Sequence, residues 1–166
     1  MRRNHGPQVS AKKILTISKR TMNLMRLELS LFSDVETGGI LLGYSNSTDI
    51  SVYEATDGGY KNVIHEAGKF EYDAEYVEHI SNHISMLYQP QLELIGIWHK
   101  HNHANDPALS HADRKLGRQI RQLLGKDAIS ILFQKQDCDT YKMRIFVVNS
   151  SLRHREINTA NVIIEE

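Results

Sequence analysis

Short apolar runs alternate along this chain with stretches in which apolar residues recur at helical spacing. Residues 14–17, which read Ile-Leu-Thr-Ile, predict a short strand. Apolar side chains then recur at every third or fourth position over residues 19–32, which predicts an amphipathic helix that begins after Ser18. Residues 39–44 form a compact apolar run that suits a buried strand, and residues 50–55 predict a second strand. The first third of the chain is therefore expected to fold as a strand, a helix and two strands.

The rest of the chain continues this alternation. Asp73 is a residue type that caps helices, and Pro90 ends the helix that follows it. Ser110 begins another helix, which Gly125 ends. The apolar residues expected to face the core are Tyr76, Ile80, Ile84 and Leu87 in the first of these helices, and Leu116, Ile120 and Leu123 or Leu124 in the second. The strands predicted here are residues 69–72, 92–98, 128–133, 141–148 and, at an edge, 162–164.

Helices and strands alternate without an internal repeat or a stretch that resembles a linker. This order predicts a single domain of the α/β or α+β class that spans residues 1–166. A chain of 166 residues is long enough to bury a core without covalent crosslinks.

The charge balance and the cysteine content exclude several classes of protein. Lys and Arg together number 20, as do Asp and Glu, so no overall field attracts nucleic acid or an anionic membrane. The single cysteine, Cys138, can form neither an internal disulfide nor a cysteine-rich zinc site. No apolar run approaches the roughly 20 residues of a membrane span, and residues 1–8 are too polar for a secretory signal. We therefore expect a cytoplasmic protein with no nucleic-acid or membrane partner.

Histidines gather in one short stretch of the chain. Four of the nine, His99, His101, His103 and His111, fall within thirteen residues. His99 and His101 directly follow the predicted strand 92–98, and alternate residues of a strand face the same side. Their imidazoles are therefore expected side by side, at a spacing that suits one metal ion.

A carboxylate that can complete this site lies at the start of the next predicted helix. Ser110 and Asp113 are three positions apart, so they share one face of that helix. If the loop folds back, Asp113 supplies a third ligand and leaves a fourth position for water, as in catalytic zinc sites. Zinc lowers the pKa of such a water to about 7. Hydrolysis also needs a proton acceptor and an oxyanion donor, and Ser110 is placed to be that donor.

Three segments together carry a family resemblance. They read Glu-Thr-Gly-Gly-Ile-Leu-Leu-Gly at residues 36–43, Gly-Ile-Trp-His-Lys-His at residues 96–101 and Ser-His-Ala-Asp at residues 110–113. Their order resembles the JAB/MPN domain of JAMM zinc metallopeptidases, in which a distant glutamate precedes His-x-His, a loop and Ser-x-x-Asp. By this resemblance Glu36 is the catalytic acid and base, and Trp98 matches the aromatic residue before the first histidine.

The resemblance implies a fold, a cofactor and an activity. The fold is a curved mixed β-sheet flanked by helices, with its core at about residues 14–148. The activity is hydrolysis of the amide bond after the C-terminal glycine of a ubiquitin-like protein, in deconjugation or in precursor processing. The site it implies consists of one zinc ion (Zn2+), the ligands His99, His101 and Asp113, and the catalytic residues Glu36 and Ser110.

The short chain also resembles free-standing bacterial JAB proteins. Some of these are encoded beside E1-like and E2-like enzymes, including in antiphage defence systems. The implied partners are a ubiquitin-like protein or its conjugates, together with E1-like and E2-like enzymes of the same pathway.

The histidine segment departs from the family pattern at two positions and in one spacing. Lys100 replaces the usual Ser or Thr, and Asn102 replaces Pro. The loop after His101 is one residue longer than usual. An alternative register, His101-Asn102-His103, resembles the RadC branch of the superfamily and leaves the loop one residue short. We prefer the first register because Trp98 matches the peptidase branch, and His103 is then a bystander, an alternative ligand or a substrate contact.

Other interpretations stay open. Ser110 and Asp113 also fit a capping box, whose function is to begin a helix. A non-catalytic MPN scaffold that binds a partner protein is another interpretation, although such members typically lack some of the ligands present here. A further one is a JAMM peptidase that acts on a sulfur-carrier protein or a small peptide.

Overall fold

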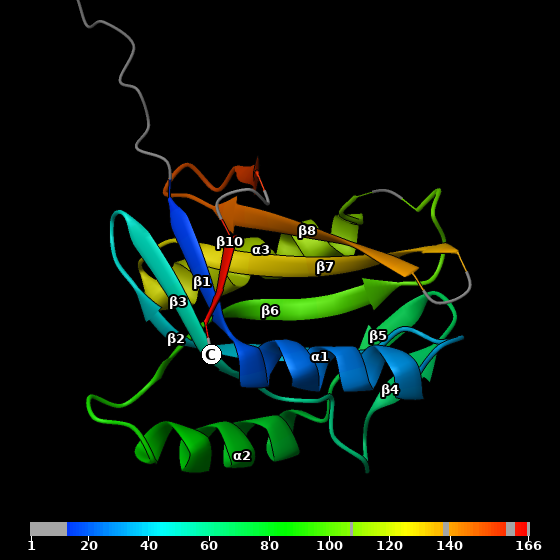
Figure 1. Ribbon diagram of the computed structural model, residues 1–166, viewed down its shortest axis with the longest axis horizontal. Coiled ribbons are helices and arrows are strands. Elements are labelled where there is room, and N and C mark those ends of the chain that lie inside the picture. The colour runs from blue at the N-terminus through cyan, green and yellow to red at the C-terminus, as the bar shows by residue number, and fades with distance from the viewer. Residues whose placement is uncertain (1–12, 107, 138–139, 159–161, 166) are drawn as a thin grey trace, which may run out of the picture.

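A mixed sheet runs through the centre of the molecule (Figure 1). Cys138 and residues 1–8, for which predictions are made above, lie outside the described residues. The computed structural model describes residues 13–106, 108–137, 140–158 and 162–165. In this part of the chain eight strands form one sheet, in the order β10-β1-β3-β2-β6-β7-β8-β9. Their bounds are β1 Ile14–Ser18, β2 Gly38–Ser45, β3 Asp49–Ala55, β6 Glu93–His101, β7 Ala128–Asp137, β8 Thr140–Val148, β9 His154–Ile157 and β10 Val162–Glu165.

Parallel and antiparallel pairs are combined in this sheet. β1 pairs in parallel with β10 and β3, and β6 pairs in parallel with β7. The other neighbouring strands are antiparallel. A separate two-stranded hairpin is formed by β4 (Ile64–Glu66) and β5 (Lys69–Glu71). The predicted mixed sheet with flanking helices is confirmed.

Three helices flank the sheet in the described chain: α1 Lys19–Leu31, α2 Ala74–Met86 and α3 His111–Leu124. Each begins at the residue predicted to cap it. Ser18, Asp73 and Ser110 each accept a hydrogen bond from the backbone N–H three positions later. Gly125 ends α3 in the left-handed conformation, at a φ of 67°.

The helices cover opposite faces of the sheet (Figure 1). Met25 of α1 packs with Trp98 of β6 in the larger core. Val77 of α2 and Ile120 of α3 pack with Ile97 of β6 in the second core. Successive residues of β6 therefore enter different layers, as the alternation of a strand requires. No helix among the described residues has both the length and the apolar character needed to cross a membrane.

One predicted detail of burial is wrong, and the structure decides between two leucines that were predicted as alternatives. Leu87 is 80% exposed, because α2 ends at Met86 and Leu87 lies beyond its last turn. The buried residue of α2 is Val77. Leu123 is 77% exposed, so the half-buried Leu124 is the leucine that packs against the core. Strands β4 and β9 were not predicted. Both are short and carry charged residues, and β9 pairs only with β8 at the edge of the sheet, so neither forms an apolar run.

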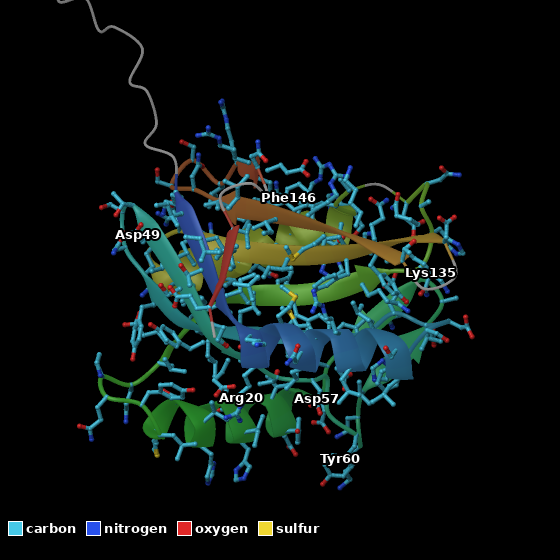
Figure 2. The ribbon with its side chains drawn as sticks, in the orientation of Figure 1. Arg20, Asp49, Asp57, Tyr60, Lys135 and Phe146 are labelled. Carbon is cyan, nitrogen blue, oxygen red and sulfur yellow. The ribbon has the colours of Figure 1, made fainter. Side chains whose placement is uncertain are left out.

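One end of the sheet gathers the segments that carry the candidate site. β6 and β7 are parallel and α3 lies between them in the chain, so the carboxyl end of β6 leads toward the start of α3. The start of β2 pairs with this end of β6. Figure 2 shows Lys135, on β7, at this end of the sheet and Asp49 at the opposite end. The carboxyl ends of parallel strands are where α/β sheets commonly place ligands.

Candidate metal centre

Strand β6 ends with the two histidines predicted as ligands. Ile97, His99 and His101 lie two positions apart along β6, so all three face the side of the sheet that α3 covers. Both imidazoles are buried, since the residues are 7% and 5% exposed. Their Nε2 atoms lie 3.2 Å apart, so the two nitrogens border the same small volume.

The first turn of α3 brings a carboxylate to this point. The Ser110 Oγ accepts a hydrogen bond from the Asp113 N–H at 3.1 Å, and the Ser110 N–H donates to Asp113 Oδ2 at 2.7 Å. This reciprocal pair is the predicted capping box. The same carboxylate faces the histidines, with Oδ1 3.3 Å from Nε2 of His99 and Oδ2 3.4 Å from Nε2 of His101. Helix capping and presentation of the carboxylate are therefore one arrangement, because the cap fixes the side chain that presents the oxygens.

The spacing of these donor atoms fits a tetrahedral metal ion. Ligands held at about 2.0–2.1 Å from zinc in a tetrahedron lie about 3.3–3.4 Å from one another. The two Nε2 atoms lie 3.2 Å apart, and each faces a different oxygen of the carboxylate: Asp113 Oδ1 lies 3.3 Å from His99 Nε2 and Oδ2 lies 3.4 Å from His101 Nε2. Within the described chain, these three form the only group of three or more His, Cys, Asp or Glu side chains with convergent ligand atoms. Two imidazoles and a carboxylate leave one tetrahedral position for a further ligand.

Electrostatic interactions keep the carboxylate ionised. Burial raises the pKa of Asp113, but hydrogen bonds from His101 and His99 outweigh this effect and hold the pKa well below its usual range. Burial lowers the pKa of His101, yet the hydrogen bond and the charge of Asp113 leave it raised overall. The surroundings of the histidines are thus negative, which favours a cation between them.

Glu36 lies across the ladder from the histidines. In the antiparallel pairing of β2 with β6, Gly38 stands opposite His99. Glu36 precedes β2, but the Lys100 N–H donates to the Thr37 carbonyl oxygen at 2.8 Å, so the pairing continues past Gly38. Extended by one more residue, this register puts Glu36 opposite His101 and on the same face of the sheet. The ladder therefore brings the glutamate to the metal-ligand side, although it is far from the histidines in sequence.

Glu36 borders the same cavity as two of the ligands. The cavity has a volume of about 230 Å³, and its lining includes His99 and Asp113. Burial raises the pKa of Glu36 to about 7, against the lowering effect of His101 and with a further increase from the charge of Asp113. A carboxyl group that titrates near neutral pH beside a metal-ligand cluster suits proton transfer. Apolar wall residues of the cavity are Phe70, Tyr72, Ile97 and Leu116.

Gly38 has no room for a side chain. A Cβ there would lie 2.4 Å from the Trp98 carbonyl oxygen, and 2.9 Å from both His99 Cβ and the Phe70 ring. The first glycine of the Thr-Gly-Gly motif therefore has a steric basis, because it lets the start of β2 approach β6 beside a metal ligand.

His103 stays outside the cluster. Its side chain is exposed, and its N–H donates to Asp106 Oδ2 at 3.0 Å. The buried Gln134 of β7 holds this loop by donating to the carbonyl oxygens of Ala104 at 3.0 Å and Asp106 at 2.8 Å. The arrangement brings together the ligands of the first register, with His99 rather than His103 facing the carboxylate.

Three other residues around Glu36 were given no structural role from the sequence: His65, Lys100 and Asp106. His65 of β4 places Nδ1 2.8 Å from the Glu36 carbonyl oxygen, and Nδ1 carries the proton because a carbonyl only accepts. Asp106 contributes a negative charge that acts on Glu36. Lys100 is fully buried, and burial together with the charge of Lys135 lowers its pKa to about 8. The signal that could have found Lys100 is strand parity, which places it on the buried Trp98 side of β6; nothing comparable marks His65 or Asp106.

The comparisons with known proteins find a similarity in sequence to a probable metalloprotease and a similar fold, and they do not show a family. No family model matches the chain. Over 109 residues the chain is 28% identical to a probable metalloprotease, y4qB, of Sinorhizobium fredii (strain NBRC 101917 / NGR234). The aligned part covers 65% of this chain and 66% of that relative, slightly under two thirds of its length. The solution structure of protein DSY2949 from Desulfitobacterium hafniense has a similar fold, with a TM-score of 0.64 and 17% identity over 92% of this chain and 94% of that one.

Proposed function

We propose that this protein is a JAMM-type zinc peptidase that cleaves the amide bond after the C-terminal glycine of a ubiquitin-like protein. The observation that carries the proposal is the convergence of His99, His101 and Asp113 beside Glu36, with each imidazole Nε2 3.2–3.4 Å from the other imidazole and from a carboxylate oxygen. The similarity to a probable metalloprotease supports the peptidase class. The substrate class rests on the resemblance of the three sequence segments to the JAMM pattern.

The roles of the side chains follow from their surroundings. Zinc would be held by Nε2 of His99, Nε2 of His101 and an oxygen of Asp113, and when bound it supplies Lewis-acid activation of water and of a carbonyl group. Glu36, with a pKa of about 7, accepts the proton of the attacking water and later donates a proton to the leaving amine. The Ser110 Oγ accepts from the Asp113 N–H, so its own proton remains available for the oxyanion.

The proposed substrate is the extended C-terminal tail of a ubiquitin-like protein or of a conjugate. Such conjugates would be made by E1-like and E2-like enzymes of the same pathway, as in an antiphage defence system. The cavity beside Glu36 offers the tail an apolar wall formed by Phe70, Tyr72 and Leu116, which shields the scissile bond from bulk water.

The proposal is tested by separating metal binding from turnover. Glu36→Gln removes the proton acceptor and leaves all three ligands, so we expect bound zinc as in wild type and a kcat lower by about 10²–10⁴-fold. The substrates are ubiquitin and a bacterial ubiquitin-like protein, each carrying a fluorogenic amide at the C-terminal glycine, and a short peptide with the same amide.

Glu75→Gln provides the matched control, because it neutralises an exposed glutamate on α2 outside the site. It should retain the wild-type kcat. An active Glu36→Gln enzyme would remove Glu36 from the mechanism. Equal cleavage of the short peptide and of the ubiquitin-like substrates would replace the proposed substrate class with small peptides.

A further inference from the structure

We infer that Lys100 and Asn102 are positioning residues that hold the segment carrying Glu36 at a fixed distance from the metal ligands. The inference rests on the proposed role of Glu36. These are the two positions at which the histidine segment departs from the JAMM pattern, and they alternate along the chain with His99 and His101. The ligands face the site, and the residues between and after them bind the loop before β2.

The ammonium group of Lys100 is enclosed at the C-terminal end of α1. The residue is 0% exposed and lies on the Trp98 side of β6, away from the histidines. Its Nζ donates to the carbonyl oxygen of Phe32, which caps α1, and to that of Ser33 at 3.0 Å. The ring of Tyr141 lies 5.7 Å from Nζ and adds a cation–π contact.

These carbonyl groups need donors from outside the helix. Helix α1, which is described over its full length, has no basic side chain in its last turn. Lys135 of β7 donates to the same Ser33 carbonyl at 2.9 Å, and its Nζ lies 3.6 Å from an oxygen of Asp34. Two lysines from neighbouring strands therefore fix residues 32–34, which end two positions before Glu36.

Asn102 adds a further contact to the same loop, at Asp34. Its Nδ2 donates to the Ala67 carbonyl oxygen at 2.8 Å and to that of Asp34 at 3.4 Å. Asn102 thereby links the loop before Glu36 to the turn between β4 and β5.

The backbone of Glu36 itself is held on both sides by β4. Its N–H donates to the Glu66 carbonyl oxygen at 2.8 Å, and its carbonyl oxygen accepts from Nδ1 of His65 at 2.8 Å. The His65 ring in turn stacks on Phe32 with the ring centroids 4.0 Å apart. Contacts from β6, β7 and β4 therefore converge on one short segment whose purpose in the proposed mechanism is to present a carboxylate.

The consequence is that the end of β6 and the residue after it position both the metal ligands and the segment that carries Glu36. A catalytic group displaced by about 1 Å can lose about 10²-fold in rate. Lys100→Met keeps most of the aliphatic stem and removes the donor. We expect a kcat lower by about 10–100-fold, with KM within about threefold of wild type and full zinc content, because substrate binding and the ligands are not altered.

Lys13→Met is the matched control. Lys13 also donates to a backbone carbonyl, that of Asn46 at 3.2 Å, and pairs with Asp127 at 2.8 Å, but it lies directly before β1. The second readout is hydrogen exchange of the Glu36 amide, which needs neither zinc nor substrate. Exchange should be faster in Lys100→Met and unchanged in Lys13→Met.

The outcomes separate this inference from the proposed function. A wild-type protein that cleaves no substrate overturns the proposed function, whereas the exchange of the Glu36 amide still decides the positioning role. Wild-type exchange and wild-type kcat in Lys100→Met overturn the inference, as do equal losses in Lys100→Met and Lys13→Met. If Lys100→Met does not fold, Asn102→Ala and Lys135→Met each remove one side chain that holds the loop before Glu36. Both variants must then show faster exchange of the Glu36 amide, or the inference fails.

Discussion

Replacing Gly38 with alanine tests whether the close approach of β2 to β6 sets the geometry of the site. The new Cβ would lie 2.4 Å from the Trp98 carbonyl oxygen, about 1 Å closer than the C···O contacts of about 3.3–3.6 Å that recur between strands. It would also lie 2.9 Å from His99 Cβ and from the Phe70 ring. The carbonyl group belongs to the backbone of a central strand and cannot turn aside, so the start of β2 must move away from β6.

The expected effect on stability follows from this overlap. Overpacking of this kind costs about 1–3 kcal/mol. For a chain of this size each kcal/mol lowers Tm by about 2–4 °C, so we expect a decrease in Tm of about 2–12 °C. Because Glu36 lies two residues before Gly38, a shift of about 1 Å should also lower kcat by up to about 100-fold.

Gly68→Ala is the control for this substitution. A Cβ at Gly68 has no described atom within 4 Å, and the residue lies in the turn between β4 and β5. Its alanine variant should be neutral or more stable by up to about 1 kcal/mol. Thermal unfolding with and without zinc, followed by steady-state kinetics, measures both variants. A Gly38→Ala protein with the Tm and kcat of wild type would refute the steric argument.

Two further predictions concern a buried acid and a metal ligand. Burial and the charge of Asp57 raise the pKa of Glu28, so the folded protein binds this proton more tightly than the unfolded chain, and stability falls as the pH rises above about 4.5. Glu28→Gln can still accept the hydrogen bond from Thr37. We expect this variant to have a higher Tm than wild type at pH 8 and no such advantage at pH 4, as thermal scans at both pH values would reveal. Asp113→Asn should lose zinc, so a chelator should lower the Tm of wild type but not of this variant. A ligand present at 1,000 times its Kd contributes about 4 kcal/mol to stability, which sets the size of the effect. Equal sensitivity of the two proteins to the chelator would contradict the assignment of Asp113 as a ligand.

Local signals predicted most of the elements of this fold because caps and terminators act over a few positions. Ser18, Asp73 and Ser110 begin the three described helices, and Gly125 ends the last one, as their residue types indicate. Burial at the helix ends was harder to predict. Leu87 matches the apolar spacing of α2, yet it lies past the last turn and faces solvent.

The candidate site required contacts between distant segments, which periodicity does not contain. Strand parity alone indicated that His99 and His101 share a face. The position of Glu36 depends on the register of β2 against β6, which a single sequence does not fix, so only the family resemblance pointed to it. From the sequence, Lys100 was only a departure from the family motif. In the fold its side chain extends from β6 to the end of α1, where its ammonium group donates to backbone carbonyl groups.

The most direct test of the metal centre is an anomalous difference map, measured at the zinc absorption edge on crystals of the protein grown with zinc. We predict one strong peak per chain, about 2.0–2.1 Å from Nε2 of His99, Nε2 of His101 and an oxygen of Asp113. A peak coordinated by His103 in place of His99, or the absence of a peak among these residues, would contradict the proposed metal centre.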